Sequence, residues 1–199
     1  MDNVESVFDS FPSLETERFV LREIQPSDAE AVFACFNDDE VTRFYDQPTF
    51  TAVEQAEKLI LHMRQGFRDR RSIRWGIARK EDNWLLGTCG YNTWNRYARK
   101  TGVGYELAQP YWRQGVMTEV LTAVLTFGYQ RMNLNRVEAL VMPGNVGSEK
   151  VLAKLGFQCE GLLRQYAYFK DSFYDLQMFA LLKQDWLKAL ARPPLEVTR

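Results

Sequence analysis

The sequence predicts an α/β fold, in which helices flank a central, twisted mixed sheet. Three observations lead to this prediction. Strand-like and helix-like segments alternate along the chain, a glycine-bearing turn joins a strand to a helix, and two strand-like segments follow one another near the end. With 46% hydrophobic and 14% aromatic residues, the 199-residue chain can bury a full core. We expect an N-terminal arm over 1–13, loosely held, a single domain over 14–188 and a C-terminal tail over 189–199.

Segments rich in aliphatic, aromatic and β-branched residues, bounded by polar turns, are expected to be strands. These segments are 18–24, 73–79, 85–94, 102–107, 136–142, 160–169 and 173–182. A polar turn at 81–83 joins two of them, and the turn at 170–172 joins the last two as a hairpin. The order of elements, β-α-α-β-β-β-α-β-α-β-β, is that of a mixed sheet covered by helices.

The helices between these strands are predicted from apolar residues at helical spacing. The first begins at Pro26, and the other three extend over 51–70, 114–132 and 145–155. Ser27 with Glu30, and Thr51 with Glu54, have the spacing of capping boxes at the starts of the first two helices. Gly156 is expected to end the last helix in the left-handed conformation.

Charge and cysteine content exclude several classes of protein. The net charge of -1 gives no basic excess for binding nucleic acid. Cys35, Cys89 and Cys159 are odd in number and widely spaced, which favours buried free thiols in a reducing compartment over disulfides or a zinc site. The chain shows no signal-peptide pattern and no apolar run long enough for a membrane helix. We therefore expect a cytoplasmic protein that binds neither membranes nor metals.

The turn before the third helix carries the clearest ligand signal. It reads Trp-Arg-Gln-Gly-Val-Met-Thr over 112–118. A helix start presents unpaired N–H groups and a positive dipole end, which together suit a phosphate. We expect the N–H groups from Gly115 to Thr118 to hold a pyrophosphate, with Arg113 and the Thr118 hydroxyl as further donors. The alternative is an ordinary turn whose glycine only starts the helix, and the spacing matches neither the P-loop nor the dinucleotide fingerprint.

Several short motifs occur in one order and at compact spacing. They are Gly-Tyr-Glu-Leu at 104–107, Tyr-Trp-Arg-Gln-Gly at 111–115, Asn-Arg-Val-Glu-Ala at 135–139, Asn-Val-Gly-Ser at 145–148 and Lys-Leu-Gly-Phe at 154–157. Together they resemble the GNAT superfamily of acetyl-CoA-dependent N-acetyltransferases. The resemblance is closest to the ribosomal-protein-alanine N-acetyltransferase branch, of the RimJ and RimL kind, and it covers about residues 14–186.

The resemblance implies a GNAT-like fold, with acetyl-CoA (coenzyme A) as the cofactor. The pyrophosphate loop falls on 112–117, where Trp112 and Met117 depart from the family's usual Gln or Arg and Gly or Ala. The pantetheine arm is expected between two parted parallel strands, 104–107 and 137–142, whose backbones bond its amides. The cofactor-binding residues implied are Tyr105, Leu107, Trp112, Arg113, Gln114, Gly115, Val116, Met117, Thr118, Val141, Asn145 and Ser148.

The implied reaction is direct attack of a neutral primary amine on a thioester, so the amine must first lose a proton. Glu106 is the first candidate base, because the resemblance puts its strand beside the thioester. The alternative for Glu106 is a solvent-facing or ion-paired residue. Ser148 is the candidate donor to the leaving thiolate, unless it only caps its helix. Many GNAT enzymes have a Tyr for this role where this chain has Leu152, and Cys159 is expected to be buried rather than nucleophilic.

The acceptor is less closely defined than the cofactor. The branch resemblance favours the α-amino group of a protein or peptide, while polyamines, amino acids, antibiotics and amino sugars stay open. The rival reading is a non-catalytic acyl-CoA sensor or interaction module. Side chains that can line the acceptor cleft are Asp39, Glu40, Asp46, Tyr166, Tyr168 and Tyr174. His62 is expected to be a surface or packing residue, and the protein is expected to be a monomer, or a homodimer formed through the terminal hairpin.

Overall fold

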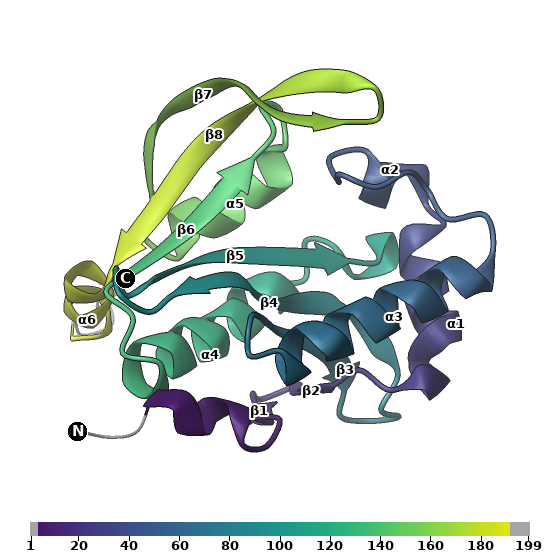
Figure 1. Cartoon of the computed structure of the whole chain (residues 1–199), viewed down its shortest axis with the longest axis horizontal. Helices are drawn as coiled ribbons and strands as arrows, with labels where there is room; N and C mark the ends of the chain where they lie inside the picture. The colour runs from purple at the N-terminus through teal and green to yellow at the C-terminus, as the bar shows by residue number, and fades with distance from the viewer. Residues whose placement is uncertain (1–3, 192–199) are drawn as a thin grey trace, which may run out of the picture.

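The computed structural model describes residues 4–191, through which one mixed sheet of eight strands runs (Figure 1). The strand order is β1-β2-β3-β4-β5-β6-β8-β7. The strands are β1 Leu14–Glu15, β2 Phe19–Glu23, β3 Ile73–Arg79, β4 Leu85–Asn95, β5 Lys100–Leu107, β6 Arg136–Val141, β7 Gln158–Phe169 and β8 Ser172–Leu182. Neighbouring strands are antiparallel except β5 and β6, which are parallel. The predicted mixed sheet is confirmed, and β1 is an additional short strand.

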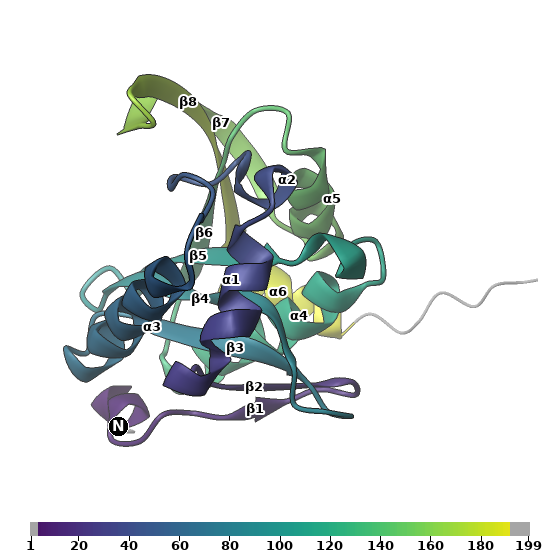
Figure 2. The same cartoon turned by 90° about the vertical axis from the view of Figure 1, so that its right-hand side faces the viewer.

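Helices cover both faces of the sheet. The α-helices are α1 Ala29–Phe36, α2 Asp39–Thr42, α3 Val53–Arg68, α4 Val116–Arg131, α5 Val146–Lys154 and α6 Lys183–Leu190, and the 3-10 helices are η1 Val4–Phe8, η2 Pro26–Asp28 and η3 Gln109–Tyr111. α1 and α3 pack together over one face, and α4 and α5 lie over the other (Figure 2). The sequence did not predict α2 or α6. Within residues 4–191, no helix combines the length and the apolar character needed to cross a membrane.

The N-terminal segment is packed against the domain, which corrects the expectation of a loosely held arm over 1–13 as far as the structure describes it. Phe8 is buried, and its ring centroid lies 5.2 Å from that of Phe67. Trp75 Nε1 donates a hydrogen bond to the carbonyl oxygen of Pro12 at 2.6 Å. These contacts join segments far apart in the chain, so no local pattern in the sequence indicates them.

The first helix begins differently from the prediction. Ser27 lies inside η2, and α1 starts two residues later, so the capping box of Ser27 with Glu30 is wrong. The carboxylate of Asp28 instead accepts a hydrogen bond from the backbone N–H of Gln25 at 2.7 Å. Asp28 therefore takes the part predicted for Glu30, two residues earlier, and its carboxylate is held there by Arg22.

The cap of α3 is also displaced by one residue. The side chain of Gln55 accepts hydrogen bonds from the N–H groups of Thr51 and Ala52, at 2.7 and 3.0 Å. Glu54 was therefore the wrong partner for Thr51. The left-handed end of α5 is confirmed, because Gly156 has φ of +89°.

The β7–β8 hairpin closes across Lys170 and Asp171, whose φ values of +48° and +56° are those of a tight hairpin turn, as predicted. Lys170 Nζ donates to the carbonyl oxygen of Thr42 at 2.8 Å, so the tip of the hairpin touches α2. β7 lies at the edge of the sheet. The homodimer formed through this hairpin stays a prediction.

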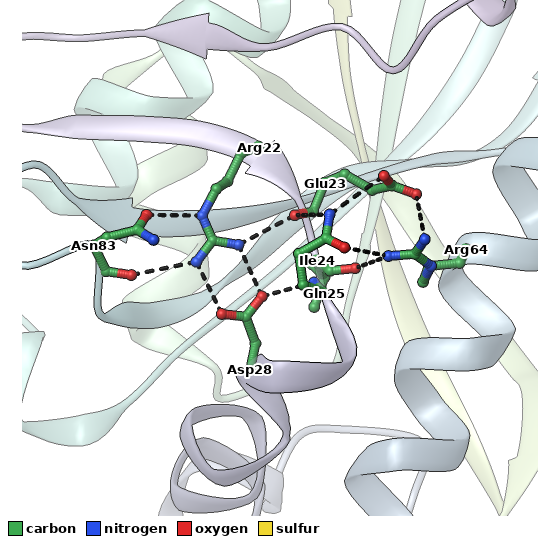
Figure 3. Close-up of polar contacts among 7 residues, drawn as sticks. All are labelled: Arg22, Glu23, Ile24, Gln25, Asp28, Arg64 and Asn83. Atoms are coloured by element: carbon green, nitrogen blue, oxygen red, sulfur yellow. Dashed lines mark hydrogen bonds and ion pairs between the residues drawn. The ribbon is translucent and has the colours of Figure 1, made fainter.

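A polar cluster fastens the end of β2 to η2 and α3 (Figure 3). Arg22 makes two hydrogen bonds of 2.8 Å to the carboxylate of Asp28, and its Nε donates to Asn83 Oδ1 at 2.9 Å. Arg64 Nη1 donates to the carbonyl oxygen of Ile24 at 3.0 Å. The Arg22 and Asp28 side chains are both largely buried. Because Asp28 directly precedes α1, the ion pair fixes the start of this helix against β2.

Replacing Arg22 by Met is expected to lower the free energy of unfolding by about 2 kcal/mol, because Asp28 then loses its charged hydrogen-bond partner. The measurement is urea unfolding followed by tryptophan fluorescence. Arg79→Met is the matched control, since Arg79 makes a similar pair with Asp82 on the open surface. Equal losses in the two variants would contradict the structural role given to Arg22.

Candidate active site

The parallel strands β5 and β6 pair for a short distance and then part (Figure 1). The paired residues are Lys100 with Arg136, Thr101 with Val137 and Gly102 with Glu138. Beyond them β5 continues to Leu107 and β6 to Val141, without pairing to each other. The facing edges of the two strands therefore offer backbone N–H and C=O groups that neither strand satisfies for the other. A narrow ligand with amide groups can bind between them.

The turn after β5 ends at the start of α4. Arg113 and Gly115 both have positive φ, +61° and +76°. The first helical hydrogen bond runs from Glu119 N to Gly115 O, so the N–H groups of residues 116–118 have no acceptor within the helix. A Cβ added to Gly115 would meet only Arg18 Nη2, at 3.7 Å, so its backbone is open to approach. This geometry suits an anion.

Side chains of the turn brace it from within. Trp112 Nε1 donates to the carbonyl oxygen of Leu107 at 2.6 Å, and Gln114 Nε2 donates to that of Pro110 at 2.8 Å. The carbonyl of Leu107 is thus already engaged by Trp112. Val116 and Met117 are buried in the core. Met117 is larger than the Gly or Ala usual at this position, but its side chain packs into the core and leaves the turn open. Arg113 is exposed and Thr118 half-buried.

Arg18 connects this turn to β2 and was missed by the sequence analysis. Its backbone N–H and Nε donate to the carboxylate of Glu119 at 2.9 and 2.7 Å, and its Nη2 donates to the carbonyl oxygen of Gln114 at 3.1 Å. Burial raises the pKa of Glu119, but the hydrogen bonds from Thr16 and Arg18 outweigh it and hold that pKa below the ordinary value. Arg18 therefore offsets a negative charge beside the anion site. The two residues are 101 apart in the chain, and no local signal links them.

Tyr105, Asn145 and Ser148 come together beside the parted strands. Asn145, and not Ser148, caps α5, with its Oδ1 accepting from Ser148 N at 3.2 Å. The hydroxyl of Tyr105 is buried and has no hydrogen-bond partner among the described residues. Burial raises the pKa of Tyr105 to about 12, while the neighbouring Ser148 opposes the rise. Tyr105 therefore keeps its proton at neutral pH. Leu152, at the position where many GNAT enzymes have a tyrosine, is fully buried in the core.

A second buried polar atom without a partner lies across the opening. Gln177 Oε1 has no hydrogen bond within the described part of the chain, and Gln177 pairs directly with Val141 at the end of β6. Tyr105 and Val141 each lie four residues beyond the Thr101–Val137 pair, so their side chains share one face. Buried polar atoms normally have partners. Unpaired atoms on both sides of the opening fit a ligand that carries hydrogen-bonding groups.

Glu106 lies on the opposite face of β5 and is 8% exposed. It forms an ion pair with Arg74, and Thr88 Oγ1 donates to its Oε2 at 2.6 Å. Arg74 Nε also donates to Thr88 Oγ1, at 2.9 Å. Burial lowers the pKa of Arg74, but the effect of Glu106 is opposite and outweighs it, so this pKa lies above the ordinary value. Glu106 is thus ion-paired and not solvent-facing, and its role as a base stays a prediction.

The remaining candidates lie farther from the opening or on the surface. Asp39 accepts a hydrogen bond from Thr49 within the α2 region, and His62 is exposed on α3. Cys159 is exposed, which corrects the expectation that it is buried, because its strand β7 is at the edge of the sheet. Cys35 and Cys89 are buried free thiols as predicted. Residues 4–191 hold no group of three His, Cys, Asp or Glu side chains able to bind a metal.

The geometry is that of a site able to hold an anionic group at the start of α4 and a narrow, amide-bearing chain between β5 and β6. A family model described as an acetyltransferase (GNAT) domain matches residues 18–158. The chain therefore belongs to the GNAT family of acetyltransferases. It is an N-acetyltransferase by this membership, and enzymes of this family use acetyl-CoA.

Individual relatives agree with this assignment. The chain is similar to the N-acetyltransferase YoaA of Bacillus subtilis, at 40% identity over 87% of this chain and 98% of that protein. It is 33% identical to the ribosomal protein uS5-alanine N-acetyltransferase of Escherichia coli, over 56% of this chain and 58% of that protein. Its structure is similar to that of Mycobacterium smegmatis RimJ in complex with a CoA disulfide, with a TM-score of 0.79, 23% identity and coverage of 90% and 94%.

Replacing Glu106 by Gln is expected to lower the free energy of unfolding by about 3 kcal/mol, because it leaves the buried charge of Arg74 uncompensated. The measurement is again urea unfolding. The double variant Arg74→Met with Glu106→Leu removes both charges and is expected to recover most of the loss. Wild-type stability of Glu106→Gln would show that the pair is not buried as described.

Proposed function

We propose that this protein transfers the acetyl group of acetyl-CoA directly to a primary amine, and that the acceptor is the α-amino group of a peptide or protein. The observation that carries the proposal is the parting of β5 and β6 beside the open start of α4. The membership in the acetyltransferase family explains why a chain with this geometry would bind acetyl-CoA. The Escherichia coli relative is named for its activity on an alanine of a ribosomal protein, which supports a peptide acceptor.

The residues of the opening fit the cofactor. The N–H groups of residues 116–118 would hold the pyrophosphate, with Arg113 beside them and Arg18 offsetting Glu119. The facing backbones of β5 and β6 would bind the pantetheine amides, together with Asn145 and the unpartnered Gln177 Oε1. When bound, acetyl-CoA supplies an acetyl group activated as a thioester, and the sulfur of CoA leaves as a thiolate.

The acceptor amine must lose a proton, and Glu106 stays our candidate for receiving it. Both hydrogen bonds to its carboxylate from Arg74 and Thr88 are made at Oε2, so Oε1 is the oxygen offered to the amine. The ion pair with Arg74 holds the carboxylate in one position on the face opposite α4. Direct transfer is favoured over a cysteine intermediate, because β8 separates the strand of Cys159 from β6.

We assign the protonation of the thiolate to Ser148 and Tyr105 together. Ser148 occupies the position that the resembled branch uses, and Tyr105 adds a buried hydroxyl that is still protonated at neutral pH. Tyr105 thereby supplies from β5 the phenol that many family members carry at the position of Leu152. Two hydroxyls beside one sulfur give a donor whichever way the thiolate is oriented.

Gly115→Ala is expected to raise the Kd of acetyl-CoA at least tenfold, because Ala resists a φ of +76° and its methyl group enters the anion site. The measurement is isothermal titration calorimetry. Gly156→Ala is the control, since Gly156 has φ of +89° at the other end of α5 and should lower stability while leaving the Kd unchanged. An unchanged Kd in Gly115→Ala would place the pyrophosphate elsewhere.

Tyr105→Phe is expected to lower kcat about tenfold while the Kd of acetyl-CoA and the stability are kept, since the hydroxyl has no partner to lose in the free protein. Steady-state kinetics and thermal unfolding measure the two effects. Tyr91→Phe is the control, because Tyr91 donates to the carbonyl oxygen of Val124 and should lose stability with little change in kcat. A wild-type kcat in Tyr105→Phe would leave Ser148 as the proton donor.

The function itself is tested by incubating the protein with acetyl-CoA and a panel of amines, with the products identified by mass spectrometry. The panel contains peptides with free and blocked N-termini, a polyamine and a simple alkylamine. We expect acetylation of the free peptide N-terminus. Turnover restricted to small amines would contradict the proposed acceptor, and binding of acetyl-CoA without any turnover would indicate an acyl-CoA sensor.

A further inference from the structure

A β-bulge in β4 redirects one side chain toward the acceptor side. Tyr91 pairs with Val103 and Thr93 pairs with Gly102, so Asn92 is an extra residue between the two pairs. Tyr91 points to α4, where its hydroxyl meets the carbonyl oxygen of Val124. Asn92 and Thr93 then both lie over β5 on the opposite face, beside Gly104 and Gly102. Bulges occur where a side chain is re-aimed next to a functional site.

The carboxamide of Asn92 is held in one orientation. Arg74 Nη1 donates to Asn92 Oδ1 at 3.3 Å, and an arginine can only donate, so the oxygen must face it. The amide nitrogen Nδ2 then lies over Gly104, 2.9 Å from where a Cβ would stand. Arg74 is itself fixed by Glu106 and Thr88. Gly104 makes room for this arrangement, which any side chain at that position would displace.

Asn92 is the exposed end of a buried polar cluster. Arg74, Thr88 and Glu106 are all buried, whereas Asn92 is exposed. The cluster therefore ends in one N–H donor group, which faces the open side of the sheet. Its partner in the free protein is solvent, so a ligand with a hydrogen-bond acceptor can take that place at little cost.

The donor group lies next to the point where β5 and β6 part. A cavity of about 540 Å³ lies over the paired end of these strands, lined by residues of β4, β5 and β6 that include Thr93, Gly102 and Glu138. Gly102 and Glu138 are the last residues that the two strands pair. Gly104 follows Gly102 by two residues, and the side chain of Asn92 packs over it. Asn92 therefore lies beside this cavity, over the first unpaired residues of β5, on the face opposite α4.

We infer that Asn92 determines acceptor specificity, by donating a hydrogen bond from Nδ2 to a carbonyl oxygen next to the amine that is acetylated. This inference rests on the proposed function. In a peptide N-terminus the amine and a carbonyl group are bonded to the same Cα, while an alkylamine or a polyamine has no carbonyl group. The site therefore selects α-amino carbonyl compounds over simple amines, and Arg74 is the residue that positions the selecting group.

The test compares two acceptors in the same variants, an alanyl tripeptide amide and propylamine. Asn92→Ala is expected to lower kcat/KM for the peptide at least tenfold, mostly through KM, and to change kcat/KM for propylamine less than twofold. Asn92→Asp keeps the shape but replaces the donor by an acceptor, so it is expected to lose the peptide preference as well. The Kd of acetyl-CoA, measured by calorimetry, reports that each variant still binds its cofactor.

Two results would overturn the inference, namely equal losses with both acceptors or no loss with the peptide. A wild-type protein that acetylates propylamine and never the peptide would refute the proposed acceptor as well. If wild-type turnover is absent, the peptide's Kd for the protein saturated with CoA replaces kcat/KM. The same tenfold loss in Asn92→Ala is then expected, so the selection by Asn92 is tested even where the proposed catalysis fails.

Discussion

The parting of β5 and β6 is the constraint on which the rest of this structure depends. A parallel pair that ends after three pairs of residues leaves the edges of two central strands unsatisfied in the middle of the sheet. The surrounding elements are arranged around this opening. α4 begins after the turn that follows β5, α5 begins after β6, and β8 pairs with the far side of β6. In our proposal an amide-bearing cofactor fills this opening, and its binding would stabilise the folded protein.

The two faces of β5 divide the chemistry. The face toward α4 carries Tyr105, whose hydroxyl is buried without a partner among the described residues, and it is the side on which we propose that the cofactor binds. The other face carries Glu106, neutralised by Arg74, with Asn92 held over Gly104 by the same arginine. One buried cation thus fixes both the candidate proton acceptor and the candidate specificity group. In the proposed arrangement, the alternation of side chains along β5 places the cofactor and the acceptor on opposite faces of the strand.

Local signals predicted most of the fold, and non-local contacts account for what was missed. The strands, the main helices, the hairpin turn and the left-handed Gly156 were all visible as patterns within a few residues. So were Gly115 and Asn145, because helix starts have local signatures. The pairing of Arg18 with Glu119, the packing of Phe8 on Phe67 and the partner of Glu106 depend on residues brought together only by folding. The bulge at Asn92 is a property of strand register, which a single strand's sequence does not reveal.

The most direct test of the central claim is a crystal structure of the protein grown with acetyl-CoA. The account predicts the pantetheine arm between β5 and β6, its amides paired with the facing backbones, and the pyrophosphate over the N–H groups of residues 116–118. Gln177 and the hydroxyl of Tyr105 should then have partners. Acetyl-CoA bound on another surface, or strands β5 and β6 closed along their full length, would contradict the account.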